Sequence, residues 1–163
     1  MSKYAFDIKN SKDFFEKLKL DYLDFQKDIL SSRLAINCAL TAWHLTDWIY
    51  EEYKDRLGFN NIGVFRKSLN CDSLLLMHDI ANGSKHFEIN RPKSNISNTN
   101  LHKGGFSRDF SFDFDVSCLI IKLDSDVEKY FETEIESVIE FWKSYFEEIL
   151  DKFNNPSPSI GEV

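Results

Sequence analysis

Ionisable and amide side chains concentrate in the segment from His78 to Phe87. Successive residues of a helix are rotated by about 100°. A helix here would therefore place five polar side chains within about one third of its circumference: His78, Asp79, Asn82, Lys85 and His86. An imidazole exchanges a proton near neutral pH, and a neighbouring carboxylate or amide can orient it. The stripe could line a functional site, or it could be a solvated helix face.

A second polar stripe occurs in the preceding apolar segment, where Asp47 is the only formally charged residue between Leu34 and Tyr50. Its members are Arg33, Asn37, His44 and Asp47. Leaving a buried polar group unsatisfied costs about 1–3 kcal/mol, so these side chains should have partners. We predict one shared polar cleft made by His44, Asp47, Asp79, Asn82 and His86, with Arg33 and Lys85 at its margins. The alternative is a hydrogen-bonded network that only fixes the register of two helices.

Basic residues gather directly after the first stripe, although the chain carries a net charge of −7. Most of the excess acid lies in residues 124–153. The basic side chains that could attract a phosphate backbone are Arg33, Arg91, Lys93, Lys103 and Arg108. Such a segment is often only a solvated loop, but its charge also suits RNA binding.

The composition predicts one folded domain over residues 1–153, followed by a flexible tail over residues 154–163. The 163 residues include 15 Phe, so large rings should fill much of the core. The three cysteines are widely spaced and lack a Cys-x-x-Cys pair, which favours reduced thiols over disulfides or zinc. We expect no cofactor and no metal. The sequence shows no secretory leader and no long apolar run, which predicts a cytoplasmic protein without a membrane span.

Hydrophobic periodicity predicts a mainly α fold. Helices are expected over residues 11–29, from Ser31 or Ser32 to about residue 53, over a short piece at 64–69, and over 72–89. Loop composition covers residues 93–105. Alternating residues at 110–120, a turn at 123–126 and an arm at 127–131 predict a β-hairpin. A capping box from Thr133 to Glu136 should begin the last helix, which runs to residue 153. The predicted architecture is a bundle of four main helices with a β-hairpin inserted before the last.

The segment Ala81-Asn82-Gly83-Ser84-Lys85-His86 resembles the Arg-Asn-x-x-x-His motif of the HEPN superfamily. That superfamily comprises helical-bundle proteins, many of them metal-independent endoribonucleases of toxin–antitoxin, CRISPR and phage-defence systems. Asn82 and His86 match the motif in identity and spacing, whereas Ala81 stands where the motif has arginine. Trp43-His44-x-x-Asp47-Trp48, followed by Asp79-x-Ala81-Asn82-x-x-Lys85-His86-Phe87, is also similar to small bacterial HEPN-like proteins. The resemblance covers residues 11–153.

The resemblance implies an RNA-directed protein in which His86 is the acid/base group and Asn82 orients it. A missing positive charge could come from Lys85, His78 or Arg33, or from the partner subunit of a homodimer. An antitoxin or another protein would be a further partner. The candidate catalytic set is His86, Asn82, Asp79, Lys85, His44 and Asp47. The alternative is a non-catalytic HEPN-type module that binds a protein or a nucleotide, and the absence of the motif arginine favours it.

Overall fold

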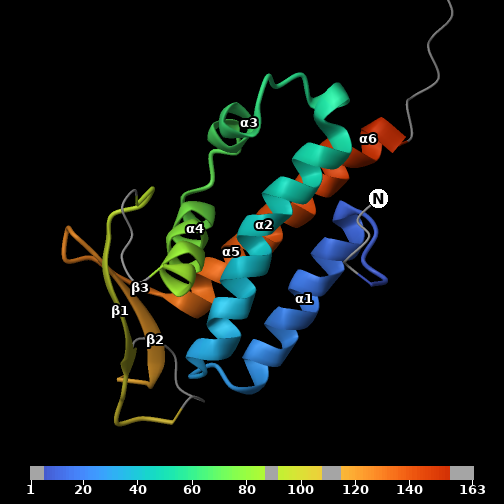
Figure 1. Cartoon of the computed structure of the whole chain (residues 1–163). Helices are drawn as coiled ribbons and strands as arrows, with labels where there is room; N and C mark the ends of the chain where they lie inside the picture. The colour runs from blue at the N-terminus through green and yellow to red at the C-terminus, as the bar shows by residue number, and fades with distance from the viewer. Residues whose placement is uncertain (1–5, 87–91, 108–114, 155–163) are drawn as a thin grey trace, which may run out of the picture.

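The protein is mainly helical and carries a small antiparallel sheet (Figure 1). The computed structural model describes residues 6–86, 92–107 and 115–154. The helices are α1 (Ser11–Lys27), α2 (Ser32–Leu57), α3 (Ile62–Ser68), α4 (Asp72–Lys85), α5 (Phe131–Tyr145) and α6 (Asp151–Asn154), with a π-helical turn at Phe146–Leu150 between the last two. The strands are β1 (Ile96–His102), β2 (Cys118–Leu123) and β3 (Glu128–Tyr130).

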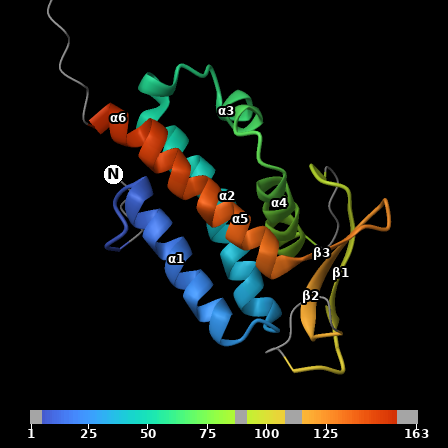
Figure 2. The same ribbon diagram turned by 180° about the vertical axis from the view of Figure 1, so that it is seen from behind.

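Helix α2 forms the centre of the bundle. It lies between α1 and α4, and α5 packs across these helices from the other side (Figures 1 and 2). Leu45, Met77 and Trp142 come from three different helices, and all three are fully buried. The sheet packs against the start of α5 through β2. No helix in the described residues is long and apolar enough to cross a membrane.

Local capping explains where the first three helices begin. The side chains of Asn10, Ser31 and Asn61 accept hydrogen bonds from backbone N–H groups in the first turns of α1, α2 and α3. The predicted cap at Ser31 is therefore confirmed. Helix α2 runs to Leu57, beyond the predicted end, and stops at Gly58, whose φ of 72° favours glycine.

Two further helix boundaries differ from their predicted positions. Helix α4 ends at Lys85, and His86 is already extended, with its N–H donating to the carbonyl of Asn82. The last three residues of the predicted helix, 87–89, lie outside the described part of the chain. Helix α5 begins at Phe131, not at Thr133, because strand β3 leads directly into it and the buried Phe131 anchors its first turn. The predicted capping box does not form.

The predicted hairpin exists as β2 and β3, joined by a turn in which the N–H of Asp126 donates to the carbonyl of Leu123. The predicted loop at 93–105 is wrong in part, because it contains strand β1, which pairs antiparallel with β2. Strand β1 lies at the edge of the sheet, and most of its side chains are exposed. Polar residues therefore occur on both of its faces. Of the predicted strand at 110–120, residues 110–114 lie outside the described chain, and β2 starts at Cys118.

Candidate functional site

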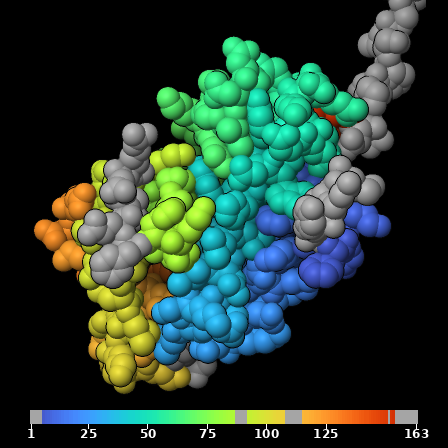
Figure 3. Space-filling model, in the orientation of Figure 1, coloured from blue at the N-terminus to red at the C-terminus, as the bar shows by residue number. Residues whose placement is uncertain are grey.

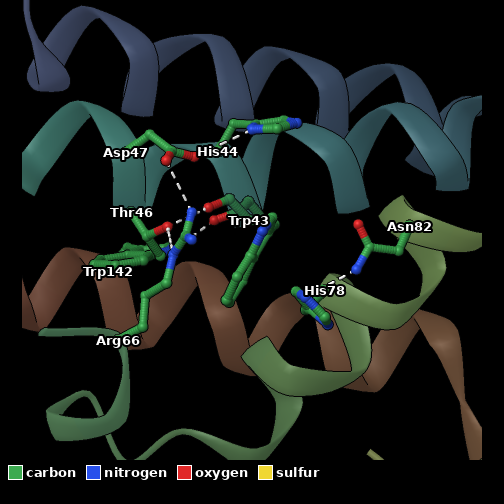
Figure 4. Close-up of polar contacts among 9 residues, drawn as sticks. Trp43, His44, Thr46, Asp47, Arg66, His78, Asn82 and Trp142 are labelled. Carbon is green, nitrogen blue, oxygen red and sulfur yellow. Dashed lines mark hydrogen bonds and ion pairs between the residues drawn. The ribbon is translucent and has the colours of Figure 1, made fainter. Parts of the chain in front are cut away.

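Trp43 on α2 is the point at which distant parts of the chain meet. Its indole is buried, and two cations lie over the ring: the guanidinium carbon of Arg66 at 4.4 Å and Nζ of Lys93 at 4.6 Å from a ring centroid. The imidazole of His78 approaches edge-on, with ring centroids 4.4 Å apart (Figure 4). Cations are attracted to an aromatic face by the ring quadrupole. The Trp43 ring on α2 therefore contacts side chains from α3, from α4 and from the segment before β1.

Helix α3 brings Arg66 to this point. The neighbouring Phe65 is fully buried and stacks on Tyr50, which fixes α3 against α2. Arg66 then donates from Nε to Thr46 Oγ1 and from a terminal nitrogen to Asp47 Oδ1, each at 2.9 Å (Figure 4). Burial lowers the pKa of Arg66, whereas Asp47 raises it. Because an arginine retains its proton in proteins, the guanidinium is held in a fixed place beside the ring, and the charge of Asp47 offsets its own.

Helix α4 contributes a buried histidine and carboxylate. His78 and Asp79 are joined between Nδ1 and Oδ1 at 2.6 Å, and the side-chain amide of Asn82 lies 2.8 Å from His78 Nε2 (Figure 4). A carboxylate only accepts hydrogen bonds, so we assign the proton to Nδ1, and Nε2 accepts from Asn82. Burial lowers the pKa of His78; Asp79 opposes this, and the charges of Lys93 and Arg66 add to it. The imidazole is therefore neutral at pH 7.

Asp79 also binds the segment that carries Lys93. It accepts the backbone N–H of Lys93 at 2.9 Å, the backbone N–H of Ser94 at 2.6 Å, and the Ser94 hydroxyl. Burial pushes the pKa of Asp79 up, but these hydrogen bonds and that of His78 outweigh burial, so the pKa lies below its usual range. Asp79 is thus ionised and fully partnered.

A cleft of about 420 Å³ opens beside these groups, between α3 and the start of α4. Its charged lining residues are Arg66, Lys67, Asp72 and Lys93. Helices α3 and α4 lie beside α2 on one face of the molecule (Figure 3). Burial lowers the pKa of Lys93, and the nearby Arg66 lowers it further. Among the described residues, no carboxylate lies within ion-pair distance of the ammonium of Lys93 or of Lys67.

The predicted single polar cleft is divided into two groups in the structure, one on each side of Trp43. Asp47 and the exposed His44 interact on α2, with the carboxylate held by Arg66. Asp79 and Asn82 interact with His78 on α4. Trp43 lies between the groups and contacts both (Figure 4). Asp47 and Asp79 do have partners, as predicted, but none of their hydrogen-bond partners comes from the other stripe.

His86 lies outside both groups. It follows the end of α4, it is exposed, and its imidazole makes no hydrogen bond or ion pair with any residue that the structure describes. Lys85 is exposed as well. Ala81, at the position of the motif arginine, is 3% exposed and belongs to the hydrophobic core. An arginine at this position of α4 would have to be buried.

The predicted basic residues separate in space. Lys93 lies in the cleft. Arg33 is exposed in the first turn of α2, ten residues before Trp43 and thus about 15 Å along the helix axis. Lys103 is exposed between β1 and β2. Arg91 and Arg108 lie outside the described residues.

Sequence reasoning did not identify Arg66, Lys67 and Ser94 as site residues. Arg66 and Lys67 are adjacent basic residues on a short helix, which is a weak signal, and they approach Trp43 only through tertiary packing. Within the described ranges, no group of three or more His, Cys, Asp or Glu residues could hold a metal ion. Comparison with known protein families, with curated proteins and with solved structures found no match to this chain.

Proposed function

We propose that this protein is a HEPN-like module that binds RNA through the cleft beside Trp43 and does not cleave it. The observation that carries the proposal is the convergence of Arg66 and Lys93 on one buried tryptophan, next to Lys67 and an open cleft. Three cationic side chains outnumber the single lining carboxylate, that of Asp72, and a cleft of this size suits the phosphates of a short RNA segment.

The charge distribution within the cleft supports an anionic ligand. Arg66 already has Asp47 as its partner, which fixes the position of the guanidinium and offsets its charge. Lys93 and Lys67 have no such partner among the described carboxylates, and their ammonium groups are free to donate to phosphate oxygens. A phosphate bound beside Lys93 and Lys67 would attract the Lys93 ammonium. This attraction would oppose the burial and the repulsion from Arg66 that lower the pKa of Lys93.

The surroundings of the motif histidine favour binding over cleavage. Cleavage of a phosphodiester by an acid/base histidine is much faster when the ring is held in place and a nearby cation stabilises the developing charge. His86 is exposed, and no described side chain holds its ring in one orientation. Ala81, at the position of the motif arginine, is buried in the hydrophobic core and supplies no cation. His78 is better oriented, but its Nε2 is occupied by Asn82.

The test is fluorescence anisotropy with a labelled oligouridylate and four proteins: wild type, Lys67→Ala, Lys93→Ala and Lys27→Ala. Lys27 is the matched control, because it is exposed and pairs with Asp24. It belongs to α1, which lies on the opposite side of α2 from α3 and α4 (Figure 1). We expect each cleft variant to weaken binding by about three- to tenfold and the control to bind as wild type does. Equal affinity of all four proteins would contradict the proposed site.

A parallel incubation with mixed RNA in EDTA tests the absence of cleavage. We expect intact RNA with wild-type protein. Cleavage that His86→Ala abolishes would overturn the non-catalytic part of the proposal and would identify a metal-independent ribonuclease. Sedimentation of the same samples would test the homodimer that the HEPN resemblance implies.

A further inference from the structure

The main chain that carries Lys93 is tied to α4 by one carboxylate. Asp79 is 2% exposed and accepts hydrogen bonds from two consecutive backbone N–H groups, those of Lys93 and Ser94. The Ser94 hydroxyl donates to the same carboxylate. On its other side the carboxylate receives His78 Nδ1, so its orientation is fixed as well. The starting point of the Lys93 side chain is thereby set relative to α4.

Trp43, the other contact of Lys93, is positioned by α2. Its ring also lies against the guanidinium of Arg66, which Thr46 and Asp47 hold by hydrogen bonds. The ammonium of Lys93 lies over the indole. Two features place it there: the position of Trp43 on α2, and the hydrogen bond from the Lys93 backbone N–H to Asp79. Without the hydrogen bonds from Lys93 and Ser94 to Asp79, the backbone there would no longer be fixed to α4, and the long Lys93 side chain would lose its fixed position.

We propose that Asp79 is the positioning residue of the RNA-binding cleft, holding the backbone of Lys93 and Ser94 so that the Lys93 ammonium stands ready over Trp43 to meet a phosphate. This inference rests on the proposed function. Asp79 is not one of the residues that line this cleft, so it acts through Lys93. An ionised carboxylate suits this role because its two oxygens accept all the donors of the segment, whereas an amide offers one acceptor oxygen.

The test is a double-mutant cycle on RNA affinity, measured by anisotropy. The proteins are wild type and Lys93→Ala, each with and without Asp79→Asn. If Asp79 acts through Lys93, the lysine substitution weakens binding by about fivefold in wild type and by less than about twofold in the Asp79→Asn protein. An effect of Asp79 on general folding alone would leave the contribution of Lys93 unchanged in the molecules that fold.

Ser94→Ala provides a milder version of the cycle if Asp79→Asn does not fold. It removes one hydroxyl donor from Asp79 and keeps both backbone donors. Its matched control is Ser73→Ala on α4, the helix that carries Asp79; this change removes a hydroxyl bond of 2.6 Å to Glu134 of α5. The Lys93 effect should shrink in the Ser94→Ala background and keep its wild-type size in the Ser73→Ala background.

The outcomes separate the two proposals. If Lys93→Ala leaves RNA affinity unchanged in wild type, both the proposed function at this cleft and the role of Asp79 are overturned. If Lys93→Ala weakens binding equally in every background, the RNA site stands and the positioning role of Asp79 is overturned. A reduced effect in the Asp79 and Ser94 backgrounds alone is the expected result.

Discussion

At the scale of single residues, the site depends on which partners its carboxylates find. The sequence indicated that Asp47 and Asp79 need partners, because polar groups on apolar helices are costly to leave unpaired. It could not indicate which partners, since Arg66 reaches Asp47 from a separate helix and Asp79 binds a segment about fifteen residues further on. Lys93 was a predicted RNA contact, and the structure places it in the cleft.

His78 predicts a pH dependence of stability. Its folded pKa lies below the ordinary value of about 6.5, because burial and two nearby cations disfavour the charged form. Between these two pKa values the unfolded chain binds more protons than the folded one. The free energy of unfolding should therefore fall as pH is lowered through about 6.5 towards the folded pKa. Urea unfolding between about pH 8 and about pH 5 measures this.

His78→Gln and His44→Gln are the matched variants for that experiment. His44 is exposed, whereas the imidazole of His78 is 8% exposed. The His78 variant should lose most of the decline, and the His44 variant should keep it. The same decline in both variants would show that another group is responsible.

At the scale of elements, the long helices were predictable and the sheet was only partly so. The apolar periods of α1 and α2 are long, and Asn10 and Ser31 cap them as their residue types suggest. Strand β1 was not recognised, because an exposed edge strand shows no alternation of apolar and polar residues. The start of α5 was misplaced because a buried Phe131 outweighed a local capping pattern.

The loop after β1 predicts different effects at two adjacent glycines. A Cβ on Gly104 would lie 2.1 Å from the backbone oxygen of Asp115, whereas one on Gly105 would have its nearest neighbour at an ordinary 3.7 Å. Because backbone cannot move aside cheaply, Gly104→Ala should destabilise the protein by about 1–3 kcal/mol. Gly105→Ala should cost much less. Thermal unfolding of both variants tests the geometry of this loop, and equal melting temperatures would contradict it.

At the scale of the whole molecule, a net charge of −7 limits where RNA can bind. Acidic residues dominate the C-terminal helices, while the cleft concentrates Arg66, Lys67 and Lys93. Long-range attraction should be weak, and binding should rely on a few close contacts. The sequence showed this asymmetry along the chain, but it could not show that α3 completes the basic group.

The salt dependence of RNA affinity follows from that small number of contacts. Two phosphate contacts on a single strand, one each from Lys67 and Lys93, predict a slope of about −1.4 in a plot of log affinity against log salt concentration. Removing Lys67 or Lys93 should each make the slope shallower by about 0.7. A slope that is much steeper, or unchanged in both variants, would place the contacts elsewhere on the surface.

The most direct test of the central claim is an NMR titration of isotope-labelled wild-type protein with a short oligouridylate. The account predicts that the indole N–H signal of Trp43 and the backbone signals of Arg66, Lys67, Lys93 and Ser94 shift together and saturate at one affinity. Signals of α1, across the bundle from the cleft (Figure 2), should stay in place. Shifts confined to Lys85, His86 or other residues away from Trp43, or no shifts at all, would contradict the account.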